Sequence, residues 1–140
     1  MDDPGRDDEL YRKRILEHAS CPHNWTPPDR PLERVDLRYH ELNPLCGDGL
    51  GVTLTVGPDG EVVAVRFAGH GCAISMAAAS MASDQIRGRT PAEILGLDRS
   101  FILALLGVEI SPLRMRCALL SLKVLKSAAL GRPAGWELTP

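Results

Sequence analysis

Apolar and polar residues follow a helical spacing at the start of the chain and a strand spacing in its middle. Residues 7–18 place Leu10, Ile15 and Leu16 among charged side chains, which predicts a modest amphipathic helix. Prolines then interrupt the pattern, so we expect an extended linker up to residue 31. Alternation of apolar and polar residues predicts three strands. The turn formers GPDG at residues 57–60 connect the second strand to the third. The strands cover residues 35–42, 50–56 and 62–67.

The predicted strands form an antiparallel meander with one apolar face. The side chains expected on that face are Val52, Leu54, Val56, Val63, Val65 and Phe67. Because an apolar face this large is unstable in water, helices must cover it.

Helical signals fill the rest of the chain. Residues 72–86 carry Ile74, Ala77, Ala78 and Met81 on one side, small enough to pack closely on a sheet. The sequence TPAE at residues 90–93 is a capping box with proline at the first helical position. The helix that it opens runs through Ile94 and Leu97, and we expect a break before residue 101.

A last helix begins after the sequence SP at residues 111–112 and ends at Gly131 and Pro133. Its predicted apolar stripe consists of Leu113, Cys117, Leu120, Val124 and Ala128. The element order predicts a single α+β domain: an N-terminal helix, a three-stranded antiparallel sheet, then three or four helices packed on one face. We expect residues 1–34 to form the helix and linker, 35–132 the core, and 133–140 a tail.

Composition and charge narrow the function classes. The 140 residues suit one domain, and a net charge of −2 with mixed acids and bases predicts neither nucleic acid nor an anionic membrane as a partner. No apolar run is long enough to cross a bilayer, and a charged stretch follows Met1 where a signal peptide would be apolar. We therefore expect a cytoplasmic protein, in which spaced cysteines remain reduced and serve as metal ligands or catalytic groups.

Three cysteines lie at junctions between predicted elements. Cys46 stands in the loop between the first two strands, Cys72 opens a helix, and Cys117 lies in the first turns of the last helix beside Arg116. A helix N-terminus and a neighbouring cation both favour thiolate over thiol. Asp48 adds an oxygen donor two residues after Cys46, so three thiolates and one carboxylate could close a tetrahedral zinc site.

Simpler interpretations exist for each of these residues. A lone cysteine on an apolar helix, such as Cys72 or Cys117, is commonly a small buried residue. Asp48 could be only a turn former, and the glycine-flanked His70 is a reserve candidate for a ligand or an acid–base group. We interpret the remaining candidates as structural or incidental: Cys21, His18, His23 and His40. Neither C-x-x-C nor H-x-x-x-H occurs, so the residues alone lead to the hypothesis of a metal site and no further.

Three segments extend this hypothesis by resemblance. NPLCGD at residues 43–48, GHGCAIS at 69–75 and RCALL at 116–120 resemble the three cysteine motifs of the U-type iron–sulfur cluster assembly family, which comprises SufU, IscU and the N-terminal domain of NifU. LEH at residues 16–18 and PHN at 22–24 resemble the N-terminal helix and turn of the same family. The form of the second motif and the basic residue before Cys117 resemble the SufU branch. The resemblance implies a SufE/IscU-like fold.

The resemblance also implies a function. A family member of this kind would accept persulfide sulfur from a SufS-like cysteine desulfurase and pass it to cluster biogenesis, with a SufBCD-type complex as a further partner. Cys46 falls on the sulfur acceptor, and Asp48, Cys72 and Cys117 fall on the other ligands of a zinc ion. Displacement of Cys46 from zinc would free a thiolate to attack the persulfide. The implied enzyme class is a zinc-dependent sulfurtransferase.

Features of two branches are combined in this chain. The short stretch between Cys72 and Cys117 is similar to IscU, but Arg116 replaces the histidine that IscU has there, and ISPLR at residues 110–114 replaces its Leu-Pro-Pro-Val-Lys motif. Three hypotheses follow: a zinc-dependent sulfur acceptor, a scaffold for a transient [2Fe–2S] cluster at the same ligands, and an adaptor in which zinc only stabilises the fold. Asp48 bears on the first two, because a carboxylate completes a zinc site well but leaves a cluster labile.

Overall fold

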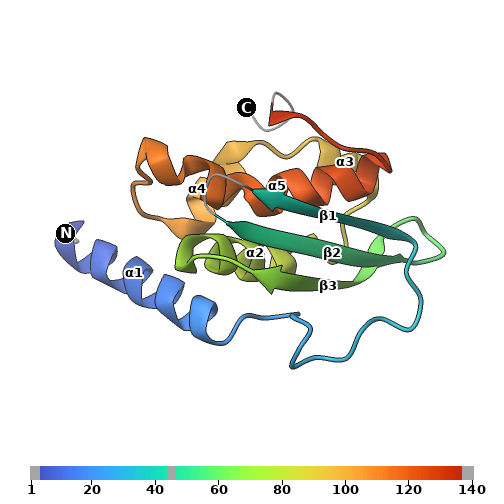
Figure 1. Ribbon diagram of the computed structural model, residues 1–140, viewed down its shortest axis with the longest axis horizontal. Coiled ribbons are helices and arrows are strands. Elements are labelled where there is room, and N and C mark those ends of the chain that lie inside the picture. The colour runs from blue at the N-terminus through green and yellow to red at the C-terminus, as the bar shows by residue number, and fades with distance from the viewer. Residues whose placement is uncertain (1–3, 44–46, 137–140) are drawn as a thin grey trace.

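The computed structural model describes the backbone of residues 4–43 and 47–136, and the side chains of these except 4–7, 43 and 48. The elements are α1 (Pro4–Ser20), β1 (Leu37–Asn43), β2 (Asp48–Val56), β3 (Val62–His70), α2 (Ala73–Ile86), α3 (Pro91–Leu95), α4 (Arg99–Leu106) and α5 (Met115–Leu130), with a 3-10 turn at Pro112–Arg114. The sheet is antiparallel in the order β1-β2-β3 (Figure 1). The predicted α+β fold class is confirmed. The domain boundaries stay predictions.

Helices α2 and α5 cover one face of the sheet, α2 against β3 and α5 against β1 and β2. Alanines and serines of α2 are buried there, since small side chains let the helix approach the strands closely. Helix α1 packs on α2, and α3 and α4 pack against α5 (Figure 1). No helix within the described residues is both long and apolar enough to span a membrane.

The linker after α1 is attached to the edge of the sheet. Trp25 stacks on Phe67 with ring centroids 6.0 Å apart. The Thr26 amide donates to the Phe67 carbonyl and the Phe67 amide donates to the Asn24 carbonyl, both at 2.8 Å. The expected extended linker therefore pairs with β3 over a short parallel bridge.

Val63 was expected in the core, and this prediction is wrong. Its side chain is 53% exposed, whereas Val62 is buried. Thr55 pairs with Ala64 but Val56 pairs with Val62, so Val63 is the extra residue of a β-bulge. A bulge reverses the side-chain alternation on one side of the irregularity, which turns Val63 to solvent.

The helix boundaries follow the predicted caps. Thr90 Oγ1 accepts from the Glu93 amide and Glu93 accepts from the Thr90 amide, both at 3.2 Å, which confirms the capping box. The predicted break before residue 101 is present, because Asp98 caps a separate helix, α4. Leu113 was expected in the buried stripe of the last helix, but it is 94% exposed. It lies in the 3-10 turn, which rotates it off the stripe.

Candidate functional site

Strand pairing brings two of the three cysteine junctions to one end of the sheet. Asn43 pairs with Asp48 at the end of β1 and the start of β2, and Gly49 pairs with His70 at the end of β3. Gly69 has φ +133°, and a Cβ there would lie 2.1 Å from the Gly49 carbonyl oxygen. Only glycine can therefore keep β2 and β3 this close where the chain leads to the second cysteine.

Cys72 and Cys117 are brought together at this end. Cys72 is the N-cap of α2 and half-buried, and Cys117 is the third residue of α5, 5% exposed. The Cys72 sulfur lies 3.6 Å from Ser75 Oγ, and the Ser75 hydroxyl donates to the Cys117 carbonyl oxygen at 3.1 Å. One buried hydroxyl thus connects the two cysteine-bearing helix starts.

Two helix N-termini meet at this end of the sheet. The first amides of a helix have no partner within it, and its N-terminus carries a partial positive charge. The helices of 14 and 16 residues that begin here at Cys72 and before Cys117 therefore bring two such ends together. Soft thiolates that converge in this way fit zinc or iron better than hard cations.

The other predicted ligands are described only in part. Cys46 lies outside the described residues, and Asp48 is described by its backbone, which opens β2. Among the described side chains, no group of three or more histidine, cysteine or acidic residues could hold a metal. His70 ends β3 and is exposed, and Cys21 follows α1 and is exposed. The ligand set of Cys46, Asp48, Cys72 and Cys117 stays a prediction.

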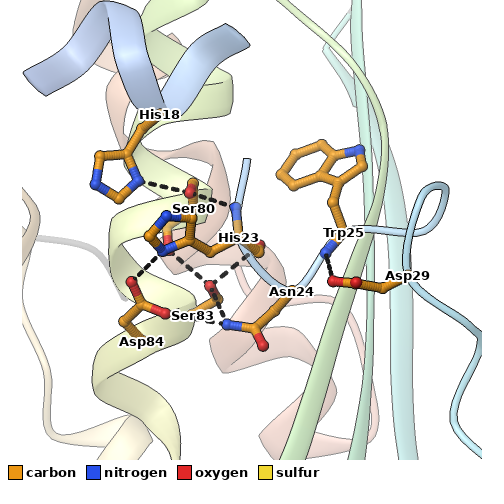
Figure 2. Close-up of polar contacts among 8 residues, drawn as sticks. All are labelled: His18, His23, Asn24, Trp25, Asp29, Ser80, Ser83 and Asp84. Carbon is orange, nitrogen blue, oxygen red and sulfur yellow. Dashed lines mark hydrogen bonds and ion pairs between the residues drawn. The ribbon is translucent and has the colours of Figure 1, made fainter. Parts of the chain in front are cut away.

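Sequence reasoning missed a polar network that attaches α1 to α2 (Figure 2). Ser80 Oγ lies 2.7 Å from His18 Nδ1 and accepts from the His23 amide at 2.7 Å. His23 Nδ1 lies 2.6 Å from the Asp84 carboxylate, and Asn24 donates to Ser83 at 2.9 Å and to Asp84 at 3.2 Å. His18 and His23 are therefore structural groups that hold the helix bearing Cys72 against the N-terminal segment.

A sequence signal for this network did exist. Ser80, Ser83 and Asp84 have the i, i+3, i+4 spacing that places polar side chains on one face of an otherwise apolar helix. Burial is the main cause that lowers the pKa of His18, followed by the nearby His23 and Arg14, while Asp84 and Glu17 oppose the shift. The structure thus favours the neutral imidazole at the α1–α2 contact.

The family of the chain is shown by comparison with known proteins. The sequence model of the NifU-like N terminal domain family matches residues 10–132, which contain all the elements from most of α1 to the end of α5. The chain belongs to this family, and the resemblance stated from its cysteine motifs is confirmed.

Individual relatives agree with this assignment. The chain is 33% identical to the zinc-dependent sulfurtransferase SufU of Bacillus subtilis, over 91% of this chain and 95% of that protein. It is 31% identical to the iron–sulfur cluster assembly scaffold protein IscU of Streptococcus pyogenes, over 85% and 82%. A crystal structure of a hypothetical protein superposes with a TM-score of 0.73 at 28% identity, over 88% of this chain and 98% of that one.

Proposed function

We propose that this protein accepts sulfur from a cysteine desulfurase at Cys46 and supplies it for iron–sulfur cluster assembly. The observation that carries the proposal is the Cys72–Ser75–Cys117 contact, which gathers two family cysteines at the end of the sheet where β1 and β2 connect. The names of the two relatives support the same process, since one is a zinc-dependent sulfurtransferase and the other a cluster assembly scaffold.

The residues divide into holding and reacting groups. Cys72 and Cys117 are anchored at helix starts, so they hold a zinc ion together with Asp48, while Cys46 is the exchangeable ligand. Bound zinc keeps the cysteines as thiolates and shields them from oxidation. The described part of the site fits that role by its donor chemistry.

Sulfur transfer then needs no external oxidant. The Cys46 thiolate attacks the outer sulfur of the desulfurase persulfide, a new S–S bond forms at Cys46, and the original S–S bond breaks. The electron pair of the broken bond leaves on the desulfurase cysteine as thiolate, and the proton of the outer sulfur moves with it or to water. The product is a persulfide on Cys46, ready for a second exchange with an acceptor.

The proposal also includes the cellular compartment and the partner proteins. We place the protein in the cytoplasm, with a SufS-type desulfurase as donor and a SufBCD-type complex as the destination of the sulfur. A transient iron–sulfur cluster at the same residues is the second candidate function, favoured by the similarity to a scaffold protein. Anaerobic incubation with iron and sulfide tests it, because a cluster would give visible absorption bands that Cys72→Ser and Cys117→Ser lack.

The deciding experiment mixes the protein with a SufS-type desulfurase and cysteine in the absence of reductant. Peptide mapping should find one added sulfur atom on Cys46. Cys46→Ser should abolish stimulation of desulfurase turnover and leave binding to the enzyme largely intact, because an interface extends well beyond one side chain. Cys21→Ser is the matched control and should behave as the unmodified protein. Added sulfur on Cys72 or Cys117, or a Cys46→Ser protein that still stimulates turnover, would refute the proposal.

A further inference from the structure

The chain after α5 turns back along the helix. Gly131 ends α5 in the left-handed conformation with φ +72°, and its amide donates to the Ser127 carbonyl at 2.9 Å. The Ala134 amide donates to Ser127 Oγ at 3.0 Å, and Ala134 is buried. The segment 131–136 therefore runs antiparallel to the last turns of α5 and returns toward the helix start (Figure 1).

Trp136 lies against two cations of α5. The Lys123 Nζ atom is 4.7 Å from its ring centroid and the Arg116 Cζ atom is 5.2 Å from it. Lys123 also forms an ion pair with Glu41 of β1 at 2.6 Å, in which the side chains are only 12% and 17% exposed. The Lys123 ammonium group is thus fixed against the indole ring of Trp136. The same ring contacts the guanidinium of the exposed Arg116.

The helix geometry places Arg116 at the end of the sheet where Cys72 and Cys117 lie. Helix α5 starts at the end of the sheet where β1 ends, so the two elements run in opposite directions (Figure 1). Seven residues separate Arg116 from Lys123, a rise of about 10 Å along the helix, which equals about three strand residues. Since Lys123 is level with Glu41, Arg116 is level with the end of β1.

We infer that Trp136 is a positioning residue that holds the Arg116 guanidinium at the edge of the cysteine site, where it stabilises the negative charge that the attacking and leaving sulfurs share during transfer from the donor enzyme. The inference rests on the proposed function. It assigns a role to the segment after the last helix, and it gives Arg116 a task separate from metal binding.

The transfer step calls for a cation at this place. A thiolate attacks a persulfide and another thiolate leaves, so two sulfurs that share negative charge approach each other. A guanidinium beside them reduces the repulsion, provided that it is already in position. The rotamer entropy of an exposed arginine opposes any single arrangement of its side chain. Contact with an aromatic face restricts that freedom before the donor arrives.

The experiment is a double-mutant cycle on sulfur transfer from a SufS-type desulfurase, with zinc-loaded full-length protein. Arg116→Ala and Trp136→Leu should each lower kcat/KM for the acceptor about two- to fivefold, the range of one exposed cation–π contact. The double variant should be no slower than Arg116→Ala alone, because Trp136 acts through Arg116. Trp136→Phe should restore most of the rate, because phenylalanine keeps an aromatic face for Arg116. Leucine covers a similar surface but has no aromatic face.

A matched control exists elsewhere in the molecule. Arg89 lies 5.4 Å from the Phe101 ring centroid, beyond the end of α2 opposite to Cys72, so Arg89→Ala should leave kcat/KM and zinc content unchanged. Losses that add in the double variant would mean that Trp136 is an independent docking residue and would overturn the inference. So would a Trp136→Leu protein that loses zinc, or one that transfers sulfur at the full rate.

A second readout separates this inference from the proposed function. The Arg116 Nε–H resonance in an NMR spectrum should carry a ring-current shift that disappears in Trp136→Leu and persists in Arg89→Ala. If the unmodified protein accepts no sulfur but this shift is present, the proposed function fails while the positioning contact stands. An Arg116 resonance that Trp136→Leu does not move would overturn the positioning role even if sulfur transfer is confirmed.

Discussion

The hydroxyl of Ser75 donates a hydrogen bond to the Cys117 carbonyl oxygen across 3.1 Å, from the first turn of α2 to the first turn of α5. Ser75 is 2% exposed, and its oxygen also lies 3.6 Å from the Cys72 sulfur. The relative position of the two cysteines therefore depends on a buried polar contact as well as on apolar packing between the helices.

Ser75→Ala should lower the free energy of unfolding of the zinc-free protein by about 0.5–1.5 kcal/mol, because it removes a buried hydrogen bond. Urea denaturation measures the effect. Ser121→Ala is the matched control in α5: its Oγ is buried without a hydrogen-bond partner among the described residues, so its removal should leave stability equal or higher. Equal losses in the two variants would show that the Ser75 contact contributes nothing specific.

Cys72→Ser and Cys117→Ser should each release zinc and destabilise the protein. We expect about one zinc ion per chain, bound through Cys46, Asp48, Cys72 and Cys117, and a structural zinc contributes on the order of 10 kcal/mol to the folding of small domains. Native mass spectrometry counts the metal. Cys21→Ser should retain zinc, since Cys21 is exposed at the end of α1. Unchanged zinc in both of the first two variants would refute the ligand set.

Asp48→Ala should slow the release of metal or of a cluster, an effect opposite to that of the cysteine variants. The reason is that a carboxylate is a harder and weaker partner than thiolate for these metals, so it keeps the site exchangeable. Competition with a chromogenic chelator measures the release rate. Faster release from Asp48→Ala would show instead that the carboxylate is an ordinary stabilising ligand or a turn residue.

The α1–α2 contact should weaken in acid because the pKa of His18 is lowered in the folded state, chiefly by burial and then by His23 and Arg14, against Asp84 and Glu17. The unfolded chain, with a pKa near 6.5, then binds the proton more tightly. Stability from this group is fully present above pH 6.5, falls as the pH drops below it, and levels off below the folded-state pKa.

Urea denaturation of the unmodified protein and of His18→Gln between pH 8 and pH 5 isolates this contribution, because few carboxylates titrate in this pH range. The difference in unfolding free energy between the two should shrink toward acid, because glutamine does not ionise in this range. His40→Gln is the control, since His40 lies on the exposed face of β1. A constant difference across this range would mean that His18 does not titrate differently on folding.

Signals within a few neighbouring residues determined much of this protein from the sequence. The capping box of Thr90 and Glu93 and the GPDG turn act between adjacent residues, so their geometry is contained in the local chain. Alternation likewise predicted the three strands and the face that the helices cover. The cysteine motifs placed Cys72 and Cys117 at helix starts, where the structure has them.

Contacts between distant segments were decided only by the tertiary structure. Ser80 meets His18 across 62 positions, and Ser75 meets Cys117 across 42, so these pairs depend on how whole helices pack. The bulge at Val63 likewise depends on the register of the partner strand. The periodicity within one strand does not specify that register. The physical reason is common to all three: a side chain's partner is set by the summed packing of elements, and a local pattern records only the neighbours along the chain.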